Sequence, residues 1–97
     1  MTCKRSEGMD LLVKALLALR TEEECRNLLD DLMTRKEVED IAQRLLVAKM
    51  LSEQAVYNKI VEKTGASTAT ISRVNRSFHY GADGYAVILE RIKEEQK

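Results

Sequence analysis

The chain contains no proline and only four glycines in 97 residues. These two residues most often interrupt regular structure, so long stretches of the chain are free to be helical. The one dipeptide typical of a hairpin turn, Asp83-Gly84, follows a helical pattern rather than a strand. The sequence therefore predicts an all-α fold in a single domain over residues 1–97.

Local signals divide the chain into six expected helices. The first covers Glu7 to Leu19, and capping-box pairs start the next two, Thr21 with Glu24 and Thr34 with Glu37. The third helix ends near Gln54, unless Ser52 caps a new helix there. The remaining helices are expected over 57–64, 68–78 and 84–95. Gly81 is expected to end the fifth in a left-handed conformation, and Asp83 to cap the sixth.

The first of these helices is apolar almost all round. Eight of the nine residues from Leu11 to Leu19 are apolar, and the apolar residues from Leu45 to Leu51 also spread around their helix. Such helices are buried on more than one side, which one short subunit can hardly achieve. The sequence therefore predicts a homodimer, with the helices within 7–54 and 84–95 forming the dimer.

Charge is unevenly distributed although the net charge is zero. Residues 22–40 hold eight acids against three bases, whereas residues 57–78 hold four bases against Glu62 alone. A basic segment of this kind suits the phosphate backbone of nucleic acid. Cys3, Cys25 and a lone histidine, His79, favour neither a disulfide framework nor a metal site, and no cofactor is predicted. Leu11–Leu19 is too short to span a bilayer, so a cytoplasmic location without a membrane partner is expected.

The basic segment has the pattern of a helix-turn-helix over residues 57–78. Gly65 can adopt the positive φ of the turn, and Ser67 can cap the second helix. Ile60 would anchor the first helix from within, and the apolar series Ile71, Val74 and Phe78 the second. The outer face of the second helix is small and polar, as entry into the major groove requires. The residues expected to contact DNA are Asn58, Lys59, Lys63, Thr68, Ala69, Thr70, Ser72, Arg73 and Arg76.

These residues also carry a resemblance. The run from Thr64 to Arg73, followed by Asn75 and Ser77, resembles the DNA-reading segment of the Trp repressor-like family. Over about residues 8–95 the chain is similar to the YerC/YecD-type members of that family. The resemblance implies a six-helix intertwined homodimer that reads double-stranded DNA. It also implies a transcription regulator that acts as a repressor. The positions that it matches to DNA contacts are Asn58, Thr68, Ala69, Thr70 and Ser72. One departure is Val56, where relatives have a small polar cap.

The same resemblance implies a place for a small ligand. The positions that hold the corepressor in Trp repressor correspond to Thr34, Arg44, Arg73 and Ser77. Val74 stands where Trp repressor has a glycine beside the ligand's indole, and a branched side chain would fill part of that slot. We therefore expect DNA binding that is independent of tryptophan. Binding of another, unidentified small-molecule effector at these positions remains an alternative.

Three other interpretations compete with these. Arg44 and Arg73 could simply pair with acids such as Asp40, or with phosphate. The carboxylate groups Glu22–Glu24 and Asp30–Asp31 could suggest an enzyme, but no nucleophile with an adjacent base is indicated, so we predict no enzyme. A dimeric helical adaptor would keep the same core and show no salt-sensitive affinity for duplex DNA.

Overall fold

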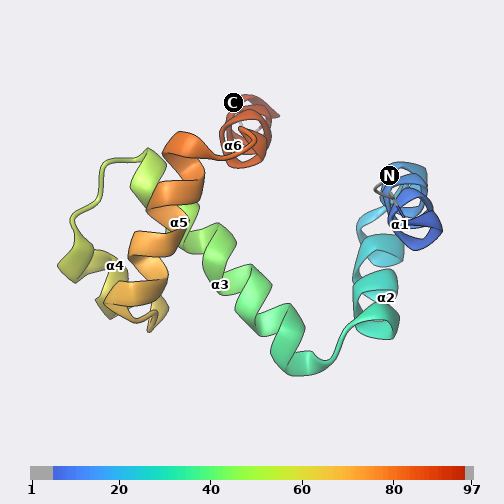
Figure 1. Cartoon of the computed structure of the whole chain (residues 1–97), viewed down its shortest axis with the longest axis horizontal. Helices are drawn as coiled ribbons and strands as arrows, with labels where there is room; N and C mark the ends of the chain where they lie inside the picture. Colours follow the sequence, from blue (N-terminus) through green and yellow to red (C-terminus); the bar gives the residue numbers. More distant parts are fainter. Residues whose placement is uncertain (1–5, 96–97) are drawn as a thin grey trace. The chain divides into compact units, whose positions relative to one another are not determined.

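The structure is a computed structural model that describes residues 6–95. All regular structure within these residues is helical, in six helices labelled α1 to α6 in Figure 1. The chain forms two compact units, one up to Val38 and one from Glu39 onward.

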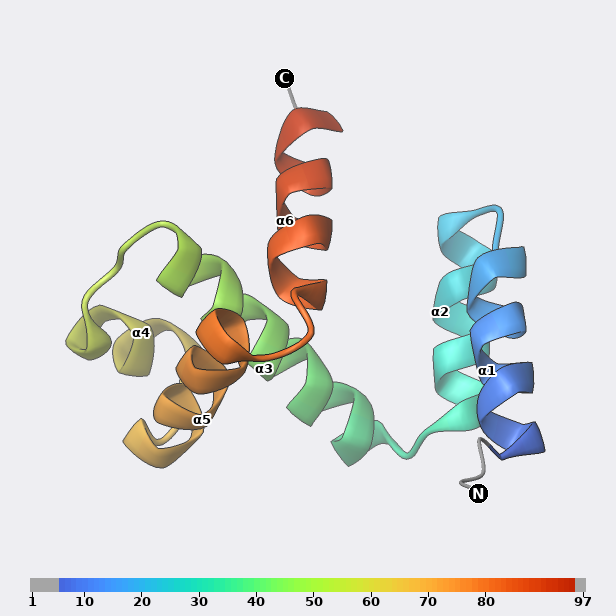
Figure 2. The same cartoon turned by 45° about the horizontal axis from the view of Figure 1, so that its top comes forward.

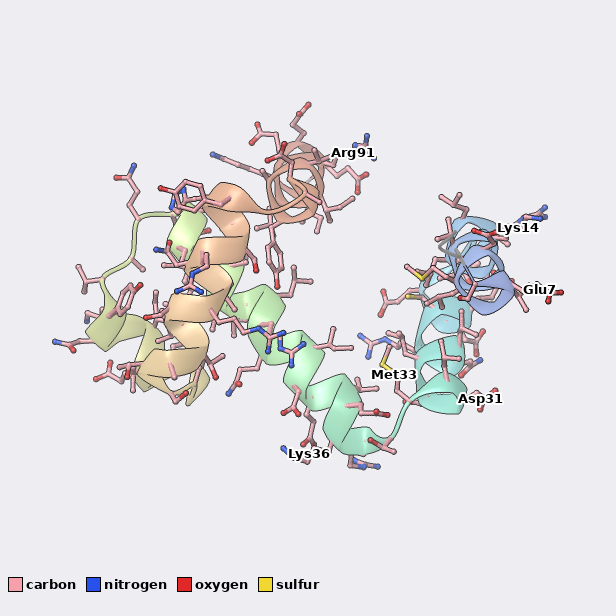
Figure 3. All side chains as sticks on the ribbon, viewed as in Figure 1. Glu7, Lys14, Asp31, Met33, Lys36 and Arg91 are labelled. Atoms are coloured by element: carbon pink, nitrogen blue, oxygen red, sulfur yellow. The ribbon has the colours of Figure 1, made fainter. Side chains whose placement is uncertain are left out.

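The first unit holds α1 (Glu7–Ala18) and α2 (Glu22–Leu32), which run in opposite directions in Figure 2. Ser6 caps α1, because its Oγ accepts a hydrogen bond from the Met9 amide at 2.9 Å. Thr21 caps α2 in the same way, through the Glu24 amide at 3.0 Å. Polar side chains such as Glu7 and Lys14 project from α1 (Figure 3). None of the described residues of this unit is buried, although α1 is rich in leucine.

The long helix α3 (Arg35–Ser52) begins in the first unit and continues into the second. Its start is the predicted capping box: the Glu37 amide donates to Thr34 Oγ1, and the Thr34 amide donates to Glu37 Oε1. At its end, the Ser52 hydroxyl donates to the Lys49 carbonyl at 2.6 Å, so Ser52 belongs to α3 rather than capping a new helix. The chain then leaves through Gln54, which has a φ of 64°.

The core lies in the second unit, where α4 (Tyr57–Thr64) and α5 (Thr68–Tyr80) pack against the second half of α3. The buried side chains of this core are all aliphatic and carry no hydrogen-bonding group. They are Val47 and Ala48 of α3, Ile60 of α4, Ala66 of the turn, and Ile71 and Val74 of α5. The apolar positions that the sequence assigned to the helix-turn-helix therefore do hold it together, with Phe78 partly buried at their edge.

The connection from α5 to α6 (Gly84–Glu95) differs from the expectation. Helix α5 continues two residues beyond Phe78, and Gly81 has a φ of −90° and a ψ of −147°, so it is not left-handed. Its need for glycine is steric, because a Cβ there would collide with the Ser77 carbonyl oxygen. The positive φ falls instead on Asp83, at 68°, whose carbonyl accepts from the Val87 amide in the first turn of α6. Phe78 and Tyr85 stack with ring centroids 6.4 Å apart, which joins α5 to α6.

The sequence was expected to contain no membrane-spanning helix and no disulfide framework. No helix among the described residues has the length and apolarity needed to cross a bilayer. Cys25 is a free, half-buried thiol on α2, and Cys3 lies outside the described residues.

Candidate nucleic-acid interface

Helix α5 separates its apolar and polar side chains onto opposite faces. Ile71 and Val74 are almost completely buried, at 0% and 2% exposure, and pack with Ile60 of α4. The side chains on the opposite face are exposed apart from Thr70, which is half-buried. The exposed ones are Thr68, Ala69, Ser72, Arg73 and Arg76. The outer face therefore offers small hydroxyls toward the N-terminal end of the helix and guanidinium groups further along.

The N-terminal end of α5 is fixed by Ser67. Its Oγ accepts a hydrogen bond from the Thr70 amide at 3.1 Å and donates one to Thr70 Oγ1, also at 3.1 Å. Because Thr70 Oγ1 accepts from Ser67, its own proton is free to be donated elsewhere. The cap thus holds the first turn in place and orients one of the hydroxyls that the sequence assigned to base contacts.

Helix α4 contributes the other predicted contacts. Asn58 and Lys59 lie in its first turn and Lys63 in its last, and all three side chains are exposed. Val56 occupies the N-cap position without making a side-chain hydrogen bond, as its apolar side chain dictates. Helix α4 nevertheless begins at Tyr57, where it was expected. The departure at Val56 therefore leaves the start of the helix unchanged.

The turn between the two helices contains a link that the sequence did not reveal. Gly65 is left-handed with a φ of 73°, as predicted, and its amide donates to the Val61 carbonyl. Just before it, the Thr64 carbonyl accepts a hydrogen bond from Nε2 of Gln43, which lies on α3. The two residues are 21 positions apart in the chain. Hydrophobic periodicity carries no signal for such a pair, because Gln43 resembles any polar residue on an amphipathic helix.

A small polar cleft of about 180 Å³ adjoins this link. It brings together Arg44 and Arg73, two of the four positions matched to a corepressor site, and Val74 also lines it. The full lining is Asp40, Gln43, Arg44, Thr70, Arg73 and Val74. Ser77 is exposed on α5 outside this lining, and Thr34 lies in the first unit as the cap of α3. Thr70 and Arg73 belong both to the cleft and to the outer face of α5.

Two short helices held at a fixed crossing by an aliphatic core, with a left-handed glycine between them, define the helix-turn-helix class of proteins. The comparisons with known proteins are more specific. The family model described as Trp repressor protein matches residues 7–93 of this chain. The protein YerC of Bacillus subtilis (strain 168) is 49% identical over 92 residues, which make up 95% of this chain and 88% of YerC.

Solved structures agree with these matches. The crystal structure of a TrpR-like protein from Eubacterium eligens ATCC 27750 has a TM-score of 0.88 and 46% identity, and the match covers 92% of each chain. A Trp repressor candidate from Staphylococcus aureus has a TM-score of 0.87 and 46% identity, over 92% of this chain and 89% of the other. The chain belongs to the Trp repressor family, a family of DNA-binding regulators. The predicted family and the predicted six-helix, all-α fold are thereby confirmed.

Proposed function

We propose that the chain is a cytoplasmic, sequence-specific regulator of transcription that binds double-stranded DNA as a homodimer and acts as a repressor. One observation supports this most directly. Helix α5 exposes hydroxyls and guanidinium groups on one face while Ile71 and Val74 anchor the other face in the core. Family membership points to the same class of activity.

Each side chain of the proposed interface has a role that its chemistry allows. Thr68, Thr70 and Ser72 carry short donors and acceptors that reach base edges in the major groove, and Ala69 can pack on a thymine methyl group. Contacts of this kind distinguish one base pair from another. The remaining positions, Asn58, Lys59, Lys63, Arg73 and Arg76, are suited to phosphate oxygens, which set the register and supply most of the affinity.

The experiment is a titration of duplex DNA at several salt concentrations, using the tightest duplex selected from a random library and a duplex of random sequence. The wild-type affinity should fall steeply as salt rises, because phosphate contacts release counterions.

Arg76→Ala should weaken the binding of both duplexes alike and reduce the salt slope by about one. Ser72→Ala should cost the selected duplex about 1 kcal/mol or more and leave the random duplex unchanged. Arg26→Ala removes an equal charge from α2 and should change neither affinity.

Two results would contradict this proposal. If Arg76→Ala and Ser72→Ala both bind like the wild type, the DNA contacts lie on another helix. If the wild-type protein shows no salt-sensitive affinity for any duplex, the dimeric helical adaptor becomes the better interpretation.

We further propose that DNA binding does not depend on tryptophan. Val74 is buried in the core and also lines the cleft, so its branched side chain occupies space beside Arg44 and Arg73. The guanidinium groups of Arg44 and Arg73 can stack on a planar ring, so it is the space taken by Val74 that works against an indole there. Thr34, Arg44, Arg73 and Ser77 remain the positions proposed for an unidentified small-molecule effector.

Isothermal titration calorimetry tests this second proposal. Wild-type protein should give no saturable heat with tryptophan, and its affinity for the selected duplex should be the same with and without the amino acid. The binding of that duplex by the same preparation serves as the control for folded protein. Saturable tryptophan binding would show that Val74 leaves the slot open.

A further inference from the structure

The C-terminal end of α4 is tied to α3 by a hydrogen bond between a side chain and the backbone. Gln43 Nε2 donates to the Thr64 carbonyl oxygen at 3.1 Å, and the pair is partly buried. The last carbonyls of a helix have no partner within the helix, so they need one from elsewhere. Gln43 supplies that partner at the residue directly before the left-handed Gly65.

Thr64 extends this link across the turn. Its hydroxyl donates to the Ile60 carbonyl at 2.7 Å and accepts from the Ala66 amide at 3.1 Å. Ala66 is itself buried, at 2% exposure, beside the core residues of α5. One residue therefore connects the end of α4, the turn and the support on α3, and Ser67 begins α5 directly afterwards.

The aliphatic core and this hydrogen bond constrain different things. Val47 and Ala48 of α3 hold the helix-turn-helix by apolar contact, which fixes how closely the elements approach but is not directional. The Gln43–Thr64 bond is directional and weakens steeply when its angle changes. It therefore restricts rotation of the α4–α5 pair on α3, and such a rotation would shift the side chains of α5 relative to base edges.

We propose that Gln43 is a positioning residue for the DNA interface and helps to determine sequence specificity without contacting DNA. This inference depends on the proposed DNA binding. Gln43 is half-buried and its amide faces the protein's own carbonyl, so losing it removes no phosphate contact. Specific recognition requires α5 in one orientation, whereas attraction to phosphates tolerates small rotations.

The test compares Gln43→Met, which keeps the side-chain length and removes the donor, with Gln43→Leu, which also removes the donor and adds no charge beside Arg73. The probes are the selected duplex and the random-sequence duplex. Circular dichroism melting identifies the variants that remain folded at the binding temperature, and either variant suffices. We expect a loss of roughly two- to tenfold on the selected duplex. The random duplex should bind unchanged, and the salt slope should equal that of the wild type.

The two proposals fail in distinguishable ways. A selected-to-random affinity ratio equal to the wild-type ratio would overturn the role of Gln43 and leave DNA binding by α5 in place. An equal loss on both duplexes would also overturn it, because it would indicate a general loss of folded protein or charge. Absence of duplex binding by the wild type would remove the proposed function itself. Arg76→Ala, which should weaken both duplexes, provides the contrasting pattern within the same experiment.

Discussion

At the scale of single residues, Gln54 holds a conformation that suits glycine better. It follows the end of α3 with a φ of 64°, while its amide donates to the Leu51 carbonyl and the Ala55 amide donates to the Met50 carbonyl. This pair of bonds is the Schellman arrangement, whose left-handed position is most often glycine. A residue with a Cβ costs about 1 kcal/mol in this conformation.

We therefore predict that Gln54→Gly stabilises the folded protein by about 0.5–1 kcal/mol, because it relieves the strain while keeping both hydrogen bonds. Thermal unfolding followed by circular dichroism should show a melting temperature higher by a few degrees. Gln54→Ala keeps the Cβ and is the matched control, with no gain expected. A melting temperature lowered by Gln54→Gly would mean that the Gln54 side chain contributes contacts worth more than the strain.

At the scale of helices, most of the fold could be predicted because helix signals are local. Thr21, Thr34 and Ser67 each accept a hydrogen bond from the amide three residues on, as predicted. The return bond of the capping box is present at Thr34, whereas the Glu24 carboxylate accepts from the Arg20 amide rather than from Thr21. The glycine turn at Gly65 also follows from its own residue type. Helix ends were less accurate: α1 ends at Ala18, one residue earlier than expected, and α5 continues to Tyr80.

The features that sequence reasoning missed depend on residues far apart in the chain or on how closely two parts of the backbone approach. The Gln43–Thr64 bond joins two helices, and nothing in either local pattern marks the two residues as partners. The conformation of Gly81 follows from how closely the chain passes the Ser77 carbonyl, which composition cannot show. The predicted site residues of α4 and α5 are placed on exposed faces, and their contacts with DNA stay predictions.

At the scale of the whole molecule, one copy of the chain leaves much apolar surface uncovered. On α1, Leu11 is 67% exposed and Leu17 is 81% exposed. In the second unit, Phe78, Leu89 and Ile92 help to line an open cleft of about 350 Å³ between α3, α5 and α6. Exposed apolar surface of this extent is typical of a protein interface. It supports the proposed homodimer, in which the helices of residues 7–54 and 84–95 would cover one another.

This proposal predicts that Leu17→Glu separates the subunits. A two-fold dimer uses the same patch on both copies, so one substitution acts twice. Losing a buried leucine costs about 1.5–3 kcal/mol per copy, before the cost of burying a carboxylate. Dimer affinity should therefore fall by at least two orders of magnitude, as sedimentation equilibrium can measure. Lys63→Glu on α4 introduces the same carboxylate at an exposed position outside the helices proposed to form the dimer, and it should leave the dimer intact. If Leu17→Glu stays dimeric at the wild-type affinity, α1 lies outside the interface. A wild-type protein that sediments as a monomer at every concentration would exclude the homodimer itself.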